Sequence, residues 1–256
     1  MTNPARLGIL DWGIGGVGVL CALRRRAPRV PVLYLSDSGH IPYGLLSRSA
    51  LRARVTRLVR HLAEGGATSV VVACNAASTV LQTLEAASAF DVPVLGMIAP
   101  ALDLVPATFR GTLGVLGGQR TIRSQVYRRG LERPGRRIVQ RIAQPLSAHI
   151  EARSTGSQRC ARDLDQILAP LRTADALLLA CTHYPAIVSL IAARLPDARL
   201  IDPADGVVAR LLARWPLPRS KLADCVLTTG NARFTRMAAT HAWGFDLGQC
   251  AHVRIA

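Results

Sequence analysis

Two parts of this chain follow the same plan, and this internal repeat restricts the possible folds more than any other feature. Residues 7–10 read Leu-Gly-Ile-Leu, and residues 113–116 read Leu-Gly-Val-Leu. Further along, Cys74 and Cys181 each end a wholly apolar run and precede a small polar residue. The two matched pairs are 106 and 107 residues apart. A near-constant offset of this kind predicts two similar α/β halves.

Strand signals alternate with helix signals along the whole chain, which predicts a mainly parallel α/β fold. Short apolar runs of this type are typical of strands buried between helices. The predicted strands cover residues 7–10, 32–35, 70–73, 94–96, 112–116, 137–141, 176–180, 199–201 and 225–228. The predicted helices cover residues 18–26, 48–64, 77–88, 121–129, 159–170, 186–195, 205–215 and 232–243.

The length and composition are those of a chain that buries one large core or two modest ones. It has 256 residues, and half of them are hydrophobic. No apolar stretch approaches the roughly 18 to 20 residues of a membrane span, and the first residues lack a signal-peptide core. We therefore expect a soluble cytoplasmic protein. Six cysteines without a Cys-x-x-Cys pair argue against disulfides and against a zinc site.

The chain is strongly basic, with a net charge of +16 and Lys221 as the only lysine among 32 basic residues. The densest basic segment runs from Arg120 to Arg141 and contains a single acid, Glu132. An exposed patch of this kind attracts nucleic acid or another polyanion. The favoured alternative is a solvated arginine-rich helix and loop, because no nucleic-acid-binding motif accompanies the segment.

Cys74 and Cys181 are the leading functional candidates. Both are expected at the carboxyl ends of parallel strands, where ligands collect, and each precedes a new helix whose dipole favours a thiolate. Either cysteine alone would be interpreted as a buried packing residue, but their paired placement favours two thiols facing one cleft. His183 follows Cys181 by two residues, and Asp11 ends the first strand, so each thiol has a neighbour that handles protons. The other cysteines are interpreted as packing residues: Cys21, Cys160, Cys225 and Cys250.

A glycine-rich turn after the first strand supports a different hypothesis. Residues 13–18 match G-x-G-x-x-G, and Asp37 ends the next strand at the distance of a dinucleotide-binding fingerprint. A glycine turn at the start of a helix also offers free N–H groups to a small carboxylate. The dinucleotide interpretation is disfavoured, because Asp11 repels phosphate and Trp12 obstructs its approach.

Several motifs resemble those of glutamate racemases in the aspartate/glutamate racemase superfamily. The matching segments are 8–16, 37–44, 72–78, 114–124 and 180–185, and they include both cysteine motifs. Weaker similarity continues through residues 200–203 and 229–234, so the resemblance spans nearly the whole chain. The two cysteine motifs together are highly specific.

The resemblance implies an α/β fold of two pseudo-symmetric domains with mainly parallel sheets flanked by helices. The active site is then expected in the cleft between the domains. We place the first domain at residues 1–97 and 208–256 and the second at residues 98–207. The C-terminal strand and helix return to the first domain.

The resemblance also implies racemisation with no cofactor and no metal. One cysteine thiolate removes the Cα proton, and the other thiol delivers a proton to the opposite face. Chemistry agrees, because a single base would return the proton to the same face. By motif, Cys74 and Cys181 are the acid/base pair, with Asp11 assisting Cys74 and His183 assisting Cys181.

Further positions are implied to hold the substrate, and Glu151 matches an acidic position of the family. The implied substrate-binding residues are Trp12, Pro42, Tyr43, Gly44, Asn75, Ala76, Thr121 and Thr182. Two of them depart from the family pattern, which usually has Ser at position 12 and Thr at position 76. Each lost hydroxyl would cost about 1 to 3 kcal/mol of binding if it had donated a buried hydrogen bond. Trp12 would also narrow the pocket if its indole points inward; the alternative is an indole that points away.

We therefore predict an isomerase that racemises glutamate, a small-molecule substrate, and supplies D-glutamate for peptidoglycan and the cell wall. One alternative is a racemase of a smaller or less polar amino acid. Another is a racemase-like binding protein without activity, whose arginine-rich surface binds a polyanion. A homodimer is a candidate assembly, nucleic acid is a less favoured partner, and no membrane association is expected.

Overall fold

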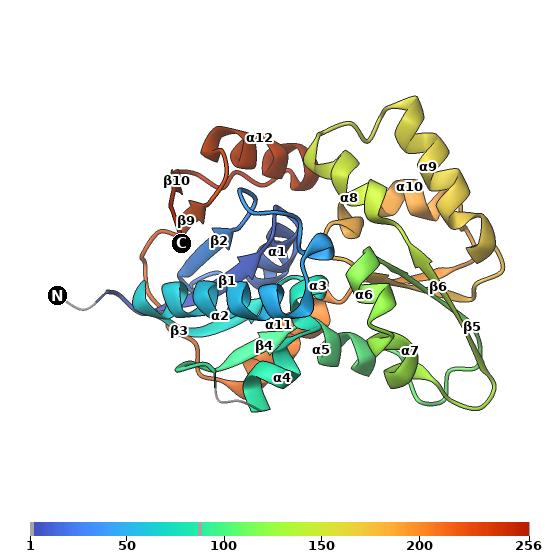
Figure 1. Cartoon of the computed structure of the whole chain (residues 1–256), viewed down its shortest axis with the longest axis horizontal. Helices are drawn as coiled ribbons and strands as arrows, with labels where there is room; N and C mark the ends of the chain where they lie inside the picture. The colour runs from blue at the N-terminus through green and yellow to red at the C-terminus, as the bar shows by residue number, and fades with distance from the viewer. Residues whose placement is uncertain (1–2, 87–88, 256) are drawn as a thin grey trace.

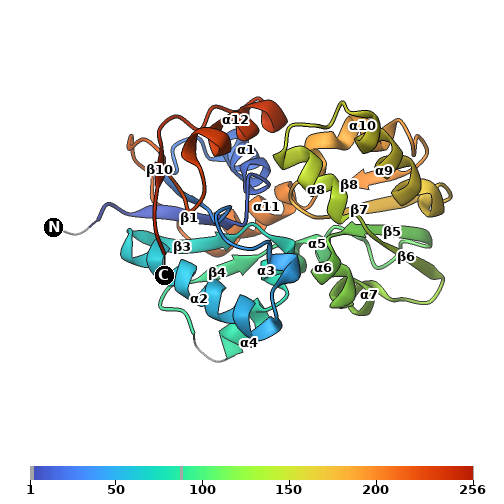
Figure 2. The same ribbon diagram turned by 45° about the horizontal axis from the view of Figure 1, so that its top comes forward.

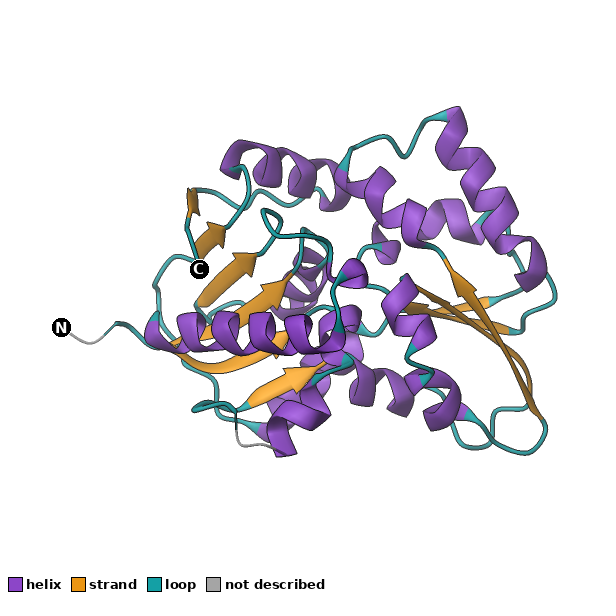
Figure 3. Cartoon of the chain, viewed as in Figure 1, coloured by secondary structure: helices purple, strands orange, loops and turns teal. Residues whose placement is uncertain are grey.

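The fold consists of two parallel β-sheets that lie side by side, as the computed structural model of residues 3–86 and 89–255 shows (Figures 1 and 3). The larger sheet has the strand order β10-β9-β2-β1-β3-β4, and the smaller has the order β6-β5-β7-β8. Every strand pair is parallel. The strands are β1 (Arg6–Asp11), β2 (Val32–Ser36), β3 (Ala67–Val72), β4 (Val94–Gly96), β5 (Gly111–Gly117), β6 (Arg136–Ile142), β7 (Ala176–Ala180), β8 (Arg199–Ile201), β9 (Cys225–Thr228) and β10 (Cys250–His252).

The two halves are related by the order of their strands. The order β2-β1-β3-β4 in the larger sheet corresponds to β6-β5-β7-β8 in the smaller one. Cys74 lies just after β3, and Cys181 follows β7 directly. Because β3 and β7 are equivalent strands, the repeat predicted from the sequence is confirmed as a repeat of fold.

Helices cover both sheets (Figure 3). The α-helices are α1 (Gly16–Arg26), α2 (Arg48–Glu64), α3 (Asn75–Ser78), α4 (Leu81–Ala86), α5 (Ile98–Asp103), α6 (Gln119–Arg123), α7 (Val126–Leu131), α8 (Gln144–Glu151), α9 (Gln158–Leu168), α10 (Val188–Ala192), α11 (Ala204–Arg214) and α12 (Ala232–Trp243). Three 3₁₀ turns complete them: η1 (Tyr43–Leu45), η2 (Ala169–Leu171) and η3 (Tyr184–Ile187). Ser47, Ser157 and Asn231 fix the starts of α2, α9 and α12, because each side chain accepts a backbone N–H of the first turn.

One buried apolar cluster extends through both halves. It includes Leu7 of β1, Leu146 of α8, Leu164 of α9 and Leu177 of β7, and it also takes in Val207 of α11. Each of these side chains is at most 1% exposed. Because apolar burial is the dominant favourable contribution to folding, this shared cluster holds the two sheets together.

The C-terminal segment returns to the larger sheet, where β9 pairs with β2 and β10 pairs with β9 (Figure 1). The indole N–H of Trp243, at the end of α12, donates to the Ile14 carbonyl over 3.1 Å. A Cβ at Gly18 would overlap the same indole. The end of the chain therefore packs on the glycine-rich turn after β1.

The predicted elements agree with the structure except where local backbone breaks interrupt a helix. Gln125 adopts a left-handed conformation, with φ of 57°, and splits the helix predicted over 121–129 into α6 and α7. The helix predicted over 77–88 is α3 followed by α4, and residues 87–88 lie outside the described part of the chain. The helix predicted over 186–195 is η3 followed by α10. The elements β10, α5 and α8 were not predicted.

The division into residues 1–97 with 208–256 and residues 98–207 stays a prediction, although the strands sort into two sheets as it requires. Within residues 3–86 and 89–255, no helix combines the length and apolar character needed to cross a membrane.

Candidate active site

A small pocket of about 50 Å³ lies where the two halves meet. All twelve residues that the sequence analysis placed at the site line it: Asp11, Trp12, Pro42, Tyr43, Gly44, Cys74, Asn75, Ala76, Thr121, Cys181, Thr182 and His183. The two cysteines come from the ends of equivalent strands in different sheets. The topology alone therefore brings two thiols to one cavity.

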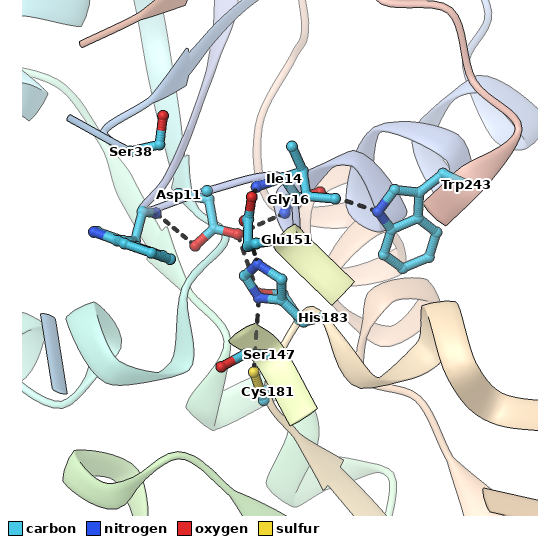
Figure 4. A network of polar contacts seen from close by, with 12 residues as sticks. Asp11, Ile14, Gly16, Ser38, Ser147, Glu151, Cys181, His183 and Trp243 are labelled. Atoms are coloured by element: carbon cyan, nitrogen blue, oxygen red, sulfur yellow. Dashed lines mark hydrogen bonds and ion pairs between the residues drawn. The ribbon is translucent and has the colours of Figure 1, made fainter. Parts of the chain in front are cut away.

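Cys181 belongs to a chain of polar contacts with His183 and Glu151 (Figure 4). The Cys181 sulfur lies 3.8 Å from His183 Nδ1, and His183 Nε2 lies 2.7 Å from Glu151 Oε1. Burial lowers the pKa of His183, but hydrogen bonds to Cys181 and Glu151 outweigh it and hold this pKa well above its usual value. These two hydrogen bonds therefore favour the protonated imidazole, although His183 is only 4% exposed.

Cys74 has a carboxylate as its neighbour. Burial, and after it the charge of Asp11, raises the pKa of the Cys74 thiol well above its usual value. Burial also raises the pKa of Asp11, against the lowering effects of His183 and Cys74. The two cysteines thus differ in their neighbours, with Asp11 beside Cys74 and His183 beside Cys181.

Internal carboxylates occupy the glycine-rich turn after β1. The Gly16 N–H donates to Asp11 Oδ2 over 2.6 Å, and the Ile14 N–H donates to Glu151 Oε1 over 2.8 Å. A Cβ at Gly15 would overlap Thr182, His183 and Asp11, and a Cβ at Gly13 would overlap Glu151. The glycines make room for acid/base side chains, so the dinucleotide interpretation of this turn is wrong.

The carboxylate of Asp37, the other part of the dinucleotide fingerprint, also has protein partners already. It accepts Arg54 Nη2 over 2.7 Å and Nε over 3.0 Å. Its other partners are the hydroxyls of Tyr43, over 2.8 Å, and Thr229, over 2.9 Å. Tyr43 lines the pocket, so Asp37 anchors one wall of the site instead of binding a ribose.

Asn75 presents a donor group to the pocket. Its Oδ1 accepts the hydroxyl of Tyr127 over 2.5 Å, which fixes the orientation of the amide. Its Nδ2 is buried and has no hydrogen-bond partner among the described residues. A buried amide left in this state is costly unless a ligand completes it.

Trp12 forms part of the pocket wall, as does Ala76. The indole N–H of Trp12 donates to the His40 carbonyl over 3.0 Å, and the ring packs against the apolar cluster around β3. These contacts fix the indole on the larger-sheet half, and both orientations, into the pocket and away from it, stay predictions.

Four further lining residues were not predicted: Gly118, Gln144, Ser147 and Ala180. Gln144 and Ser147 belong to α8, whose start carries proline near its first position, a helix-start signal. The Gln144 side chain accepts the Gln119 N–H over 3.2 Å and contacts the Ser147 hydroxyl over 3.3 Å. Glu151, at the end of the same helix, does not line the pocket but holds His183.

Over residues 3–86 and 89–255, no three His, Cys, Asp or Glu side chains lie close enough together to hold a metal ion. All six cysteines are free thiols.

Comparison with known protein families identifies the family of this chain. The model for the Asp/Glu/Hydantoin racemase family matches residues 19–211. The chain belongs to this racemase family. It is therefore an amino-acid racemase, an isomerase, and the resemblance stated from the motifs is confirmed.

The relatives of this racemase include two proteins named glutamate racemase. The one from Deinococcus radiodurans is 36% identical over 210 residues, which cover 80% of this chain and 72% of that protein. The one from Pseudomonas putida is 34% identical over 246 residues, which cover 94% and 91%.

Solved structures agree with the fold of this racemase. A glutamate racemase isoform from Bacillus anthracis superimposes with a TM-score of 0.87, at 27% identity, over 98% of each chain. The glutamate racemase of Thermus thermophilus gives a TM-score of 0.82, at 27% identity, over 96% of this chain and 95% of that one.

Proposed function

We propose that this racemase interconverts L- and D-glutamate without a cofactor, with Cys74 and Cys181 as acid and base. The observation that carries the proposal is the presence of both thiols in one pocket, each from the end of an equivalent strand. We further propose that the D-glutamate serves peptidoglycan synthesis, and that the enzyme acts in the cytoplasm, where reducing conditions keep thiols free.

The surroundings of the thiols suggest a starting protonation state. The raised pKa of Cys74 keeps it a thiol at neutral pH, and the raised pKa of His183 keeps a cation beside the Cys181 sulfur. A cation stabilises negative charge on a neighbouring sulfur. We therefore assign Cys181 as the base and Cys74 as the acid of the resting enzyme.

The proposed reaction transfers one proton on each face of Cα. The Cys181 thiolate takes the Cα proton, and the Cys74 S–H bond breaks as its proton forms the new Cα–H bond on the other face. The enzyme is left with a Cys181 thiol and a Cys74 thiolate, the form that acts on the other enantiomer. Asp11 is placed to take up a proton from Cys74 and return it.

Neutral groups are proposed to bind the substrate carboxylates, because no lysine or arginine is among the described residues that line the pocket. The unpartnered Nδ2 of Asn75 is the first donor. The hydroxyl of Thr121 adds a second, and that of Thr182 adds a third only if it turns from Asp11 Oδ2, to which it donates over 3.2 Å. Backbone N–H groups near Tyr43 and Gly44 complete the proposed site.

A smaller amino acid is the second candidate substrate, and the pocket volume favours it. A cavity needs about 10 to 15 Å³ to admit one water, so 50 Å³ holds only a few. Glutamate has ten non-hydrogen atoms, so it requires the pocket to widen. Trp12 is one of the residues that line the pocket, and we propose that its indole limits this space.

Circular dichroism of each enantiomer during incubation with the enzyme tests the proposal. We expect L- and D-glutamate each to decay to a racemic mixture. The same assay with aspartate, alanine and serine decides between the two substrates. Faster racemisation of one of these amino acids would make it the substrate in place of glutamate. An unchanged circular dichroism signal with all the amino acids, glutamate included, would contradict catalysis. The homodimer stays a prediction, which light scattering coupled to gel filtration tests.

A further inference from the structure

A second, larger cavity of about 520 Å³ lies beside the catalytic pocket and shares Gly44 with it. Its lining comes from both halves of the molecule: η1, α2 and α4 on one side, and α6 and α7 on the other. The N-terminal end of α2 faces α6 (Figures 1 and 2), and both elements contribute to the cavity lining. We call this cavity the arginine cleft, because Arg48, Arg120, Arg123 and Arg129 line it.

The arginine cleft carries positive charge that no acid balances. No aspartate or glutamate is among its described lining residues. In the described part of the chain, none of its four arginines forms an ion pair. Six other arginines do form ion pairs: Arg24, Arg25, Arg54, Arg194, Arg210 and Arg236. Carboxylates thus pair with six arginines elsewhere in the described chain and with none of the four in the cleft.

The hydrogen bonds of these arginines go to neutral acceptors. Arg120 Nε donates to the Tyr43 carbonyl over 3.0 Å, and its Nη2 donates to the Leu46 carbonyl. Arg48 donates to the Thr83 hydroxyl over 2.9 Å, and Arg129 donates to the Ser124 carbonyl over 2.8 Å. These bonds orient the guanidinium groups without cancelling their charge.

The guanidinium groups also repel one another. Burial, and after it the charge of Arg48, lowers the pKa of Arg120. An anion between Arg48 and Arg120 would relieve this repulsion. Because the two residues lie in different halves of the molecule, such an anion would contact both halves.

We propose that the arginine cleft binds a small anion carrying two or more phosphate groups. Guanidinium groups pair with phosphate through two parallel hydrogen bonds, and the Thr83 hydroxyl, which accepts from Arg48, keeps its hydrogen to donate to a phosphate oxygen. Its volume is within the range of sites for organic ligands, about 300 to 1,000 Å³. Four positive charges exceed what an amino acid with a net charge of −1 requires, so the cleft is not an extension of the substrate pocket.

Isothermal titration calorimetry with pyrophosphate and with tripolyphosphate, at about 0.15 M salt, tests this site directly and does not depend on racemase activity. The test variant is Arg123→Ala with Arg129→Ala, because both side chains are exposed and lie outside the catalytic pocket. The matched control is Arg159→Ala with Arg172→Ala, which removes two exposed arginines of the second half from outside the cleft.

We expect one saturable site in the native protein. Losing two charged hydrogen-bond donors should weaken binding by about tenfold or more in the test variant, while the control stays within about twofold, as for a surface change remote from the site. Equal weakening in both variants would show attraction to net charge only and would overturn the proposal. A titration with citrate distinguishes carboxylate binding from phosphate binding. Citrate binding as tight as that of the phosphates would overturn the assigned ligand class. Absence of saturable pyrophosphate and tripolyphosphate binding would overturn the site itself.

Discussion

The side chain beside each thiol makes the two cysteines unequal, although the strands that carry them are equivalent. Burial and Asp11 raise the pKa of Cys74, whereas the hydrogen bonds of His183 with Cys181 and Glu151 raise the pKa of the imidazole beside Cys181. The proposed mechanism uses this difference, because one thiol must remove a proton and the other must deliver one. Glu151 contacts His183 and the Ile14 N–H and does not line the pocket, so we propose that it is a positioning residue.

Glu151→Gln should lower kcat by about 10- to 150-fold, because a hydrogen bond to a charged group contributes about 1.5 to 3 kcal/mol. It should also lower the pKa of His183, so that activity declines at a lower pH than in the native enzyme. The control is Asp163→Asn, which breaks a similar pair with His149 outside the pocket, 2.8 Å long. A pH–rate profile unchanged by Glu151→Gln would contradict this role.

The same residue predicts how stability depends on pH. The pKa of His183 is raised on folding, so its contribution to stability is complete below about pH 6.5 and is lost as pH rises through the raised value. Urea unfolding should therefore show a larger deficit for Glu151→Gln at about pH 6 than at about pH 10. A deficit that grows with pH would contradict the assigned direction.

Trp12 and Ala76 predict a change of substrate preference. If the Trp12 indole restricts the pocket, Trp12→Ser with Ala76→Thr should raise kcat/KM for glutamate relative to smaller amino acids. The racemisation assay with glutamate and alanine measures the ratio. An unchanged ratio in the double variant would show that other residues of the pocket wall restrict the substrate.

Short turns and helix ends position the side chains of the site. The sequence predicts some of these turns and helices but not others. The motif around Cys74 and the strand before it were predictable, because a buried apolar run ends there. Helix α8 was not, since its eight residues are fewer than the about 11 to 18 over which a helical apolar period is recognised, and Gln144 and Ser147 were missed with it. The contact between Glu151 and the Ile14 N–H joins residues 137 positions apart, which no local pattern encodes.

The glycine-rich turn predicts a steric effect. Gly15→Ala should lower activity by about 100-fold, because its Cβ would displace Asp11, Thr182 or His183, and a shift of about 1 Å can have that cost. Gly156→Ala is the control, since a Cβ there meets nothing within 4 Å. Steady-state kinetics of both variants decides, and near-native activity of Gly15→Ala would contradict the packing described.

The loop after β2 predicts an effect on stability. Asp37→Ala should lower the free energy of unfolding by about 3 to 5 kcal/mol, because it leaves the buried Arg54 without its partner. Asp205→Ala removes a pair with Arg25 in which both side chains are more than half exposed, and should cost about 0 to 1 kcal/mol. Urea denaturation compares the two, and equal losses would contradict a structural role for the buried pair.

The two halves together make the pocket, because neither contains a complete set of groups. Thr182 of the smaller-sheet half donates to Asp11 of the larger-sheet half, and Glu151 accepts the Ile14 N–H across the same boundary. The sequence repeat predicted the two halves and their thiols. It could not predict the size of the pocket or the place of Trp12 in its wall, because both depend on how the halves pack.

Proton NMR in deuterated water tests the two-thiol mechanism most directly. With L- and D-glutamate in separate tubes, the account predicts that each product enantiomer carries deuterium at Cα while the remaining substrate keeps its proton at early times. Cys74→Ser and Cys181→Ser should each abolish this inversion, and Cys225→Ser should not. Substrate that exchanges before it inverts, or inversion that survives loss of either pocket cysteine, would contradict the account.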